Sequence, residues 1–324
     1  MRYSYRLIRI ANTNLCLNSR LYYSDKFKGK SLQGKDIKMF KSSVFNLEEA
    51  SKEQVQEFLN SFDTVLSDCD GKNLFFSHKY VMNYFRKLGK RVFYVTNNST
   101  KVRADFALKE EILSTAYLVA HYLKGIGFKK KVYLIGSNGI GDELKAVGIR
   151  HIGIGDFILF FMAKRTNQYL DSEVGAVVVG FDEHVSYPKF MKAASYLSND
   201  ECLFVATNTD ERFPKSSTII VPGTGTLVRA VETCSERKAL VLGKPNDYVR
   251  KFLQSFGLDP ARTLMIGDRC NTDIEFGVRC GFQTLLVMTG VTSVKELEKI
   301  RSERKEPLPD VVLPKLGALL DLVS

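Results

Sequence analysis

Short apolar runs alternate with helical patterns along most of this chain, from about residue 60 onward. The runs are nearly continuous in apolar residues, which is typical of parallel strands buried on both faces. The segments between them repeat apolar residues at helical spacing. This alternation predicts an α/β fold built on a doubly wound parallel sheet. The predicted strands are Phe62–Ser67, Arg91–Thr96, Val132–Gly136, Ala176–Gly180, Cys202–Ala206, Ala239–Gly243, Thr263–Gly267 and Gln283–Thr289.

Length and composition narrow the class of protein further. A chain of 324 residues favours two modest domains, and 44% hydrophobic with 26% charged residues excludes a disordered chain or a coiled-coil rod. The longest uninterrupted apolar run, Phe157–Ala163, is far shorter than the roughly twenty residues of a membrane-spanning helix. Six cysteines without a CxxC pair indicate reduced thiols rather than disulfides or a zinc site.

The basic charge is concentrated in the N-terminal segment. Residues 1–41 carry a formal charge of +8 out of +11, so the remaining chain is close to neutral and we expect no nucleic-acid partner. Met1–Ser24 holds four arginines and no acidic residue, which is typical of a mitochondrial transit peptide. A basic tail without a targeting role is the alternative. We therefore interpret residues 1–44 as a tail and predict a cytoplasmic or mitochondrial protein that is not secreted.

Two groups of polar residues follow the first two predicted strands, where ligand sites form in parallel sheets. Asp68 and Asp70 can turn towards one point, one carboxylate as a nucleophile and the other as a proton donor and acceptor. Because close carboxylates repel, a hard cation such as Mg²⁺ would stabilise both. Thr96, Asn97 and Asn98 offer a hydroxyl, amides and N–H groups that suit a phosphate. Each group alone also fits a polar turn.

Two later strands end in the same way. Lys244 follows Ala239–Gly243, where an ammonium can neutralise both a phosphate and the aspartate nucleophile. Asp268 follows the strand that ends at Gly267 and is a natural Mg²⁺ ligand, while Asp273 can orient either the metal shell or Lys244. An exposed lysine and a polar loop are the alternatives when each is taken alone. Four such segments in this order instead favour one shared site.

The four segments together carry a family resemblance. They read Asp-Cys-Asp-Gly, Thr-Asn-Asn-Ser, Gly-Lys-Pro-Asn and Gly-Asp-Arg followed by Thr-Asp, with a long insert between the second and the third. In this the chain resembles the haloacid dehalogenase superfamily of phosphatases, in the branch of phosphoglycolate phosphatase, pyridoxal phosphatase and 4-nitrophenylphosphatase. The resemblance covers residues 45–322. It implies a Rossmann-like parallel-sheet core with an inserted α/β cap domain.

The resemblance implies a role for each aspartate. Asp68 would form an aspartyl-phosphate, and Asp70 would protonate the leaving alcohol and then activate water. Mg²⁺ would be held by Asp68, the backbone carbonyl of Asp70, and Asp268, with Asp273 in support. The implied enzyme is a magnesium-dependent phosphoric monoester hydrolase.

It also implies the residues that meet the substrate. Thr96, Asn97 and Asn98 would hold the transferring phosphate, and Lys244 would complete the charge balance. His184, on the specificity segment of the cap, would touch the substrate; a surface or core histidine is the alternative. Small monoesters such as 2-phosphoglycolate or glycerol phosphate are the expected substrates, with pyridoxal 5′-phosphate as the second choice.

Domain boundaries follow from the positions of the motifs. We expect a catalytic core at residues 45–105 and 227–324 and a cap at 106–226. The resemblance further implies a homodimer formed through the cap, with a small phosphorylated metabolite as the only other partner.

The chain departs from the family pattern next to the first two motifs. After Gly71 it reaches Gly89 about five residues early, and after Arg103 roughly eight or nine residues of a helix are absent. Both losses adjoin the catalytic loops, so a weakened enzyme or a folded, inactive relative is an alternative. Nucleotide-binding classes are not supported, because the chain has no suitably placed GxGxxG and no GxxxxGK[ST].

Overall fold

The structure of the protein is a computed structural model, in which the chain from Val44 onward forms one unit. It covers residues 44–68, 75–101, 109–155, 170–213, 219–246, 248–303 and 307–324. The predicted transit peptide, Asp70 and the sites of the two apparent deletions therefore lie outside or at the edge of the described residues. Among the helices of those seven ranges, none is long and apolar enough to cross a membrane.

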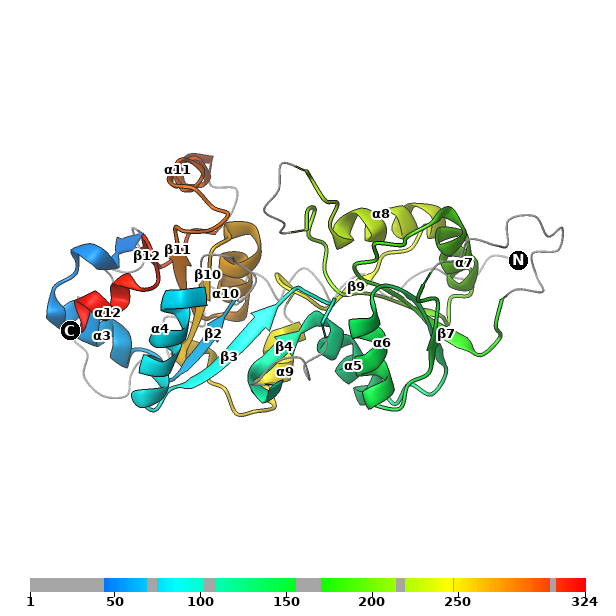
Figure 1. Cartoon of the computed structure of the whole chain (residues 1–324), viewed down its shortest axis with the longest axis horizontal. Coiled ribbons are helices and arrows are strands. Elements are labelled where there is room, and N and C mark those ends of the chain that lie inside the picture. The colour runs from blue at the N-terminus through cyan, green and yellow to red at the C-terminus, as the bar shows by residue number, and fades with distance from the viewer. Residues whose placement is uncertain are drawn as a thin grey trace, which may run out of the picture. The chain divides into compact units, whose positions relative to one another are not determined.

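The first sheet is parallel throughout and has the order β1-β12-β11-β10-β2-β3-β4. Non-consecutive neighbours and parallel pairing require helical crossovers, which confirms the predicted doubly wound α/β fold. Its strands are β1 Phe45–Asn46, β2 Thr64–Ser67, β3 Arg91–Thr96, β4 Ile112–Ser114, β10 Thr263–Gly267, β11 Gln283–Val287 and β12 Val311–Leu313. β2 is an interior strand, between β10 and β3 (Figure 1).

A second parallel sheet is built from the intervening chain, in the order β6-β5-β7-β8-β9. Its strands are β5 Lys131–Ile135, β6 His151–Ile152, β7 Val174–Val179, β8 Leu203–Ala206 and β9 Leu240–Val241. The sheet thus takes in most of the predicted cap and, in addition, β9 at residues 240–241, which lie in the range expected for the core. The exact boundaries of a core and a cap stay a prediction.

The central strand of the second sheet is buried on both faces, as its unbroken apolar sequence predicts. Ala176 and Val178 pack into a core that includes α5 (Thr115–Gly125) and α6 (Asn138–Ala146). Val177 and Val179 pack into a second core that includes α7 (Tyr187–Leu197) and α8 (Thr224–Ser235). Successive side chains of a strand point to opposite faces, so this two-residue period assigns each residue to its core. Figure 1 shows the two pairs of helices on opposite sides of the sheet.

Two helices begin at residues whose side chains cap them. Ser51 and Gln54 form a capping box at the start of α3, and the Ser114 hydroxyl accepts the N–H of Tyr117 at the start of α5. The helices are α3 Lys52–Asn60, α4 Phe75–Lys87, α5 Thr115–Gly125, α6 Asn138–Ala146, α7 Tyr187–Leu197, α8 Thr224–Ser235, α9 Tyr248–Gln254, α10 Glu275–Cys280, α11 Val294–Glu303 and α12 Ala318–Leu322. Short turns are η1 Leu47–Glu49, η4 Lys109–Glu111, η6 Pro260–Arg262 and the π-helical η7 Cys270–Ile274.

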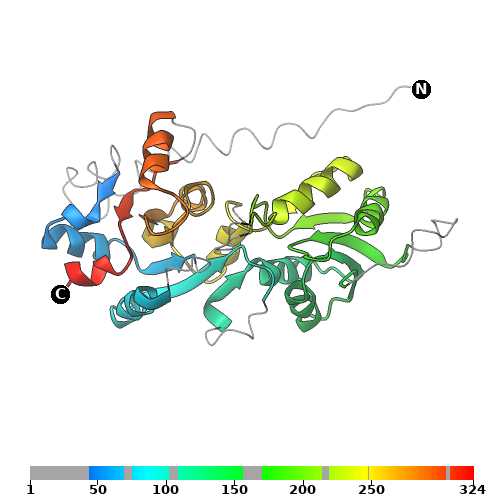
Figure 2. The ribbon, with the colours of Figure 1, turned by 45° about the horizontal axis from the view of Figure 1, so that its top comes forward.

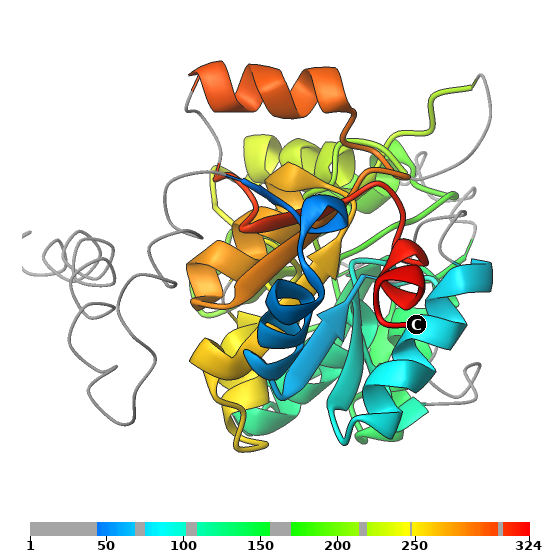
Figure 3. The same cartoon turned by 90° about the vertical axis from the view of Figure 1, so that its left-hand side faces the viewer.

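Helices also tie the ends of the described chain to the first sheet. α4 packs beside β3, and the two lie next to each other in cyan in Figure 2. The C-terminal α12 contacts η1, so the last helix lies beside the first described turn (Figure 3). The Lys52 ammonium also donates a hydrogen bond to the backbone carbonyl of Ser324.

All eight predicted strands are present within a few residues of their expected bounds. Four strands were not predicted from the sequence, and each has only two or three residues: β1, β4, β6 and β12. Segments this short contain too few positions to establish a period of two.

Candidate active site

The parallel first sheet brings three polar strand ends to one edge. Within it, Ser67 of β2 pairs with Ile266 of β10 on one side and with Tyr94 of β3 on the other. Asp68 and Asp268 follow directly after β2 and β10, and Thr96 ends β3. Because the carboxyl ends of parallel strands lie at the same edge, these residues meet there, as the sequence predicts.

Lys244 lies at the centre of the site. Its Nζ donates to Asp68 Oδ1 at 2.6 Å, to Asp273 Oδ1 at 2.7 Å and to the backbone carbonyl of Val95 at 2.9 Å. All three protons of the ammonium therefore have protein acceptors, as a side chain that is only 2% exposed requires. This arrangement is the predicted pairing of Lys244 with the nucleophile, and it makes Asp273 a direct partner of the lysine.

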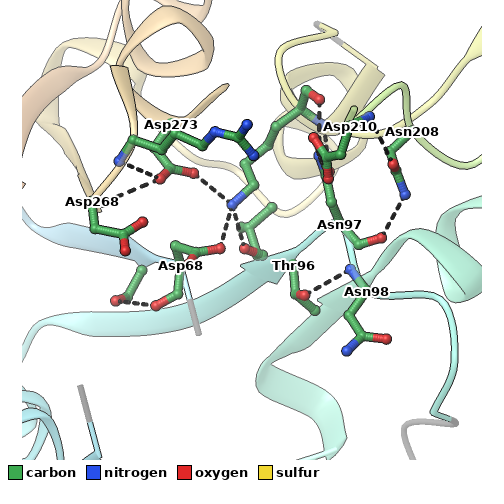
Figure 4. A network of polar contacts seen from close by, with 12 residues as sticks. Asp68, Thr96, Asn97, Asn98, Asn208, Asp210, Asp268 and Asp273 are labelled. Carbon is green, nitrogen blue, oxygen red and sulfur yellow. Dashed lines mark hydrogen bonds and ion pairs between the residues drawn. The ribbon is translucent and has the colours of Figure 1, made fainter. Parts of the chain in front are cut away.

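Backbone donors hold Asp273 in place. Its Oδ2 accepts the N–H groups of Asp268 and Arg269, both at 3.2 Å. Gly267 makes the approach feasible, since a Cβ at that position would lie 2.2 Å from the Cβ of Asp273. Figure 4 shows Asp273 above Asp68 and beside Asp268. The fourth motif therefore needs a glycine at its start.

Three carboxylates converge beside this single lysine. Asp68, Asp268 and Asp273 each offer an oxygen within 4.8 Å of the others, and all three residues are buried. With three anions and one ammonium, the group carries a formal charge of −2, which one divalent cation would neutralise. Carboxylate oxygens are the ligands that Mg²⁺ prefers. The donor set therefore fits Mg²⁺, with Asp68 and Asp268 together as predicted.

The pKa values at the site reflect this excess of negative charge. Burial raises the pKa of Asp268, and the nearby Asp68 raises it further. Burial also raises the pKa of Asp273 to about 7, although Lys244 opposes that rise. For Lys244, burial disfavours the ammonium, but Asp273 and Asp68 outweigh it and raise the pKa well above its usual value. The lysine is therefore cationic at neutral pH.

The segment after β3 forms a tight turn. The Thr96 hydroxyl accepts the N–H of Asn98 at 2.9 Å, and Asn98 Oδ1 accepts the N–H of Thr100 at 2.9 Å. Asn97 points elsewhere: its side-chain amide binds the backbone of Lys244 and the carboxylate of Asp210. Its predicted contact with phosphate would thus have to come from other atoms than the amide.

His184 lies in the segment between β7 and α7. Its residue is exposed, and its backbone N–H donates to Asp182 Oδ1 at 2.8 Å. Asp182 Oδ2 in turn accepts a hydrogen bond from Lys189 Nζ at 2.7 Å, with both side chains buried. A buried ion pair thus shapes the predicted specificity segment, while a substrate contact of His184 stays a prediction.

A small pocket adjoins the turn after β3. Its lining residues are Asn97, Asn98, Ser99, Phe181, Asn208, Asp210, Arg212, Phe213, Gly223 and Thr224. The rings of Phe181 and Phe213 stack at a centroid distance of 4.3 Å. The pocket therefore combines amide and hydroxyl groups with two aromatic rings, the cation of Arg212 and the carboxylate of Asp210.

Two features of the site were not predicted from the sequence. Asp210 accepts hydrogen bonds from Asn97. The sequence offers one indication of it, because Asp210 is a polar residue shortly after the β8 strand. The buried ring of His78 bonds to the Ser67 hydroxyl at 2.7 Å, and Ser67 directly precedes Asp68. Both contacts depend on the tertiary fold. A lone histidine in a helix carries no local signal for such a role.

Two family models match this chain over segments that contain the residues of the site. A model described as haloacid dehalogenase-like hydrolase matches residues 58–150, and one described as HAD-hydrolase-like matches residues 241–319. The first match includes Asp68 and the turn after β3, and the second includes Lys244, Asp268 and Asp273.

Individual proteins match over most of the chain. The human glycerol-3-phosphate phosphatase is 35% identical over 83% of this chain and 94% of its own. The chloroplastic phosphoglycolate phosphatase 1A of Arabidopsis thaliana is 33% identical over 92% of this chain and 89% of its own. The structure of a p-nitrophenyl phosphatase from Archaeoglobus fulgidus is similar with a TM-score of 0.68 and 25% identity, over 81% of this chain and 99% of that one. The resemblance inferred from the four motifs is confirmed.

Proposed function

This chain belongs to the haloacid dehalogenase-like hydrolases as a phosphoric monoester hydrolase, and from that premise we propose that it cleaves small phosphate monoesters through an aspartyl-phosphate on Asp68. The observation that carries the proposal is the ion pair between Lys244 and Asp68, with Asp268 and Asp273 beside it. A buried carboxylate that is held in place by a lysine is positioned to act as a nucleophile. The lysine can also stabilise the negative charge of the phosphoryl oxygens during transfer.

The first half of the reaction transfers the phosphoryl group to the protein. An Asp68 oxygen attacks phosphorus, the P–O bond to the alcohol breaks, and Asp70 gives its proton to the leaving oxygen. Lys244 offsets the charge of Asp68 and of the phosphoryl oxygens, while the turn at Thr96–Asn98 binds the phosphate. In the second half, Asp70 takes a proton from water, which attacks phosphorus and releases phosphate and Asp68.

Mg²⁺ fits the carboxylate group, and Asp68, Asp268 and the backbone carbonyl of Asp70 would hold it. When bound, it would stabilise the negative charge of the phosphoryl oxygens. The formal charge of −2 on the described groups supports this assignment.

The pocket beside Asn98 supports a small leaving group. Its lining offers a cation at Arg212, the carboxylate of Asp210 and the stacked Phe181 and Phe213 rings, which suit a compact polar alcohol. The named activities of the two enzymes compared above, on glycerol 3-phosphate and phosphoglycolate, are of this kind. We favour these esters as substrates, with pyridoxal 5′-phosphate as the alternative, and His184 as a selecting residue.

A cap at residues 106–226 is part of the same proposal. Four strands of the second sheet, β5 to β8, come from this segment, and Asp210 from it contacts Asn97 beside the catalytic group. A cap there would exclude bulk water during transfer and open for product release. Homodimerisation through this cap is the corresponding proposal for the quaternary structure.

The proposal is tested with 4-nitrophenyl phosphate followed by a panel of the three named esters. Wild-type protein should release phosphate with Mg²⁺ and lose turnover in EDTA, and Asp68→Asn should be inactive in both. Absence of turnover in the wild type would instead favour an inactive relative, in which the losses after Gly71 and Arg103 have disabled the site. Turnover by Asp68→Asn at the wild-type rate would exclude the aspartyl-phosphate.

A further inference from the structure

We propose that Asp210 is a positioning residue: it fixes the amide of Asn97, which holds the backbone of Lys244 so that the lysine reaches Asp68. The inference rests on the proposed function, because it concerns how the catalytic group is assembled. Asp210 follows the β8 strand of the second sheet, whereas Asp68 follows β2 of the first, so the contact links the two sheets.

Asn97 binds Lys244 through both ends of its amide. Asn97 Oδ1 accepts the Lys244 N–H at 2.9 Å, and Asn97 Nδ2 donates to the Lys244 carbonyl at 3.1 Å. An amide rotated by half a turn would set like groups against each other at both contacts. Only one orientation of Asn97 therefore holds the lysine backbone.

Asp210 selects that orientation. Asn97 Nδ2 also donates to both Asp210 oxygens, at 3.1 and 3.2 Å, and a carboxylate can only accept in such a contact. If the amide turned, its carbonyl oxygen would face the carboxylate. Figure 4 shows Asp210 directly beside Asn97. A carboxylate at this position thus excludes the wrong orientation by charge.

The backbone around Asp210 is itself fixed. Its N–H donates to Asn208 Oδ1 at 3.1 Å, and its carbonyl accepts the N–H of Gly225 at 2.9 Å, at the start of α8. Burial raises the pKa of Asp210, while the hydrogen bond from Asn97 opposes that rise. The hydrogen bond from Asn97 therefore offsets part of the free-energy cost of burying the Asp210 carboxylate.

Close packing at Gly243 makes the lysine backbone sensitive to this support. A Cβ on Gly243 would lie 2.5 Å from the Thr207 carbonyl oxygen and 2.6 Å from Asn97 Oδ1. The Gly243 N–H donates to the same Thr207 carbonyl at 2.7 Å. Lys244 therefore enters the site along a path lined by Thr207 and Asn97, and its Nζ lies where that path directs it.

Asp210→Asn, Asn97→Asp and the exchanged double variant test the relay by kinetics. Each single variant should lower kcat by about tenfold or more with KM changed less, because a misplaced catalytic group slows the chemical step. In the double variant, an acceptor at 97 faces a donor at 210, the reverse of the wild-type pair, so kcat should recover by about threefold or more over Asn97→Asp. Glu211→Gln is the matched control, since Glu211 is the next residue and its exposed carboxylate pairs with Arg269.

Hydrogen exchange gives a readout that needs no activity. The Lys244 amide should exchange about tenfold faster or more in Asp210→Ala than in wild type and Glu211→Gln, measured on a peptide that spans residues 240–246. If Asp210→Ala does not fold, Asp210→Asn supplies the same comparison. An inactive wild type with this exchange pattern would refute the proposed function and leave the relay supported. Wild-type kcat and unchanged exchange in Asp210→Asn would overturn the relay.

Discussion

The buried ring of His78 makes a specific contribution to the pH dependence of stability. Burial lowers its pKa from 6.5 to about 4, the nearby charge of Asp68 opposes that change, and Arg86 favours it. His78→Gln removes the titrating ring, and a glutamine amide can still donate to the Ser67 hydroxyl. The perturbation therefore changes the titration while retaining a hydrogen-bond partner for Ser67.

The sign follows from proton binding. Between pH 6.5 and 4 the unfolded chain binds a proton at residue 78 and the folded chain does not, so acidification stabilises the unfolded state. For a pKa of 6.5 in the unfolded chain and about 4 in the folded one, the loss between pH 7.5 and pH 5 is about 2 kcal/mol. The loss approaches about 3 kcal/mol once the pH lies below 4.

Urea unfolding at pH 7.5 and pH 5, followed by circular dichroism in EDTA, measures this loss; the chain has no tryptophan to serve as a fluorescent probe. The raised pKa values of Asp268 and Asp273 act in the opposite sense, so the informative quantity is the difference between wild type and His78→Gln. Lys79→Gln, an exposed change on the same helix, is the control. If His78→Gln lost as much stability on acidification as wild type, the buried neutral ring would not be the cause.

Further substitutions address other parts of the structure. Lys244→Met should reduce turnover by about a hundredfold or more, because it removes the cation that faces Asp68, and steady-state kinetics with 4-nitrophenyl phosphate would measure the loss. Gly243→Ala should lower kcat by about tenfold through displacement of the Lys244 backbone, with near-normal activity as the contrary result. Asp182→Asn should lower the free energy of unfolding by about 3 kcal/mol in urea, because it leaves the Lys189 ammonium buried without its carboxylate; a loss below about 1 kcal/mol would show that solvent reaches the pair. His184→Ala should change the order of preference among the three phosphate esters, and an unchanged order would exclude His184 as a selecting residue.

Most of the fold was accessible to sequence reasoning because its strands are buried on both faces. The run Ala176–Gly180 has no polar residue, and such a run between helical patterns has few interpretations other than a central parallel strand. The assignment of β9 to the second sheet was not accessible. Its sequence resembles that of the other strands, and which neighbour it pairs with depends on contacts remote along the chain.

Part of the candidate site could likewise be predicted from the sequence, and part of it could not. Asp68, Thr96 and Asp268 were predicted to meet because each lies at the end of a parallel strand, and this rule needs no knowledge of side-chain contacts. The hydrogen bond between Asn97 and Asp210 spans 113 residues, so no local pattern reveals it. Asn97 also shows a limit of motifs: its amide, expected to bind phosphate, hydrogen-bonds to the backbone of Lys244 instead.

The pairing of β9 with β8 has a consequence for exchanging segments between relatives. Lys244 follows β9 by only three residues, so a strand of the second sheet positions the ammonium that pairs with Asp68. A chimaera joined at residue 226 would pair this strand with a foreign β8 and shift the lysine with it. Transfer of substrate preference should therefore succeed only when residues 131–246 move as a block, and recombination inside that block should be selected against even where each parent is active.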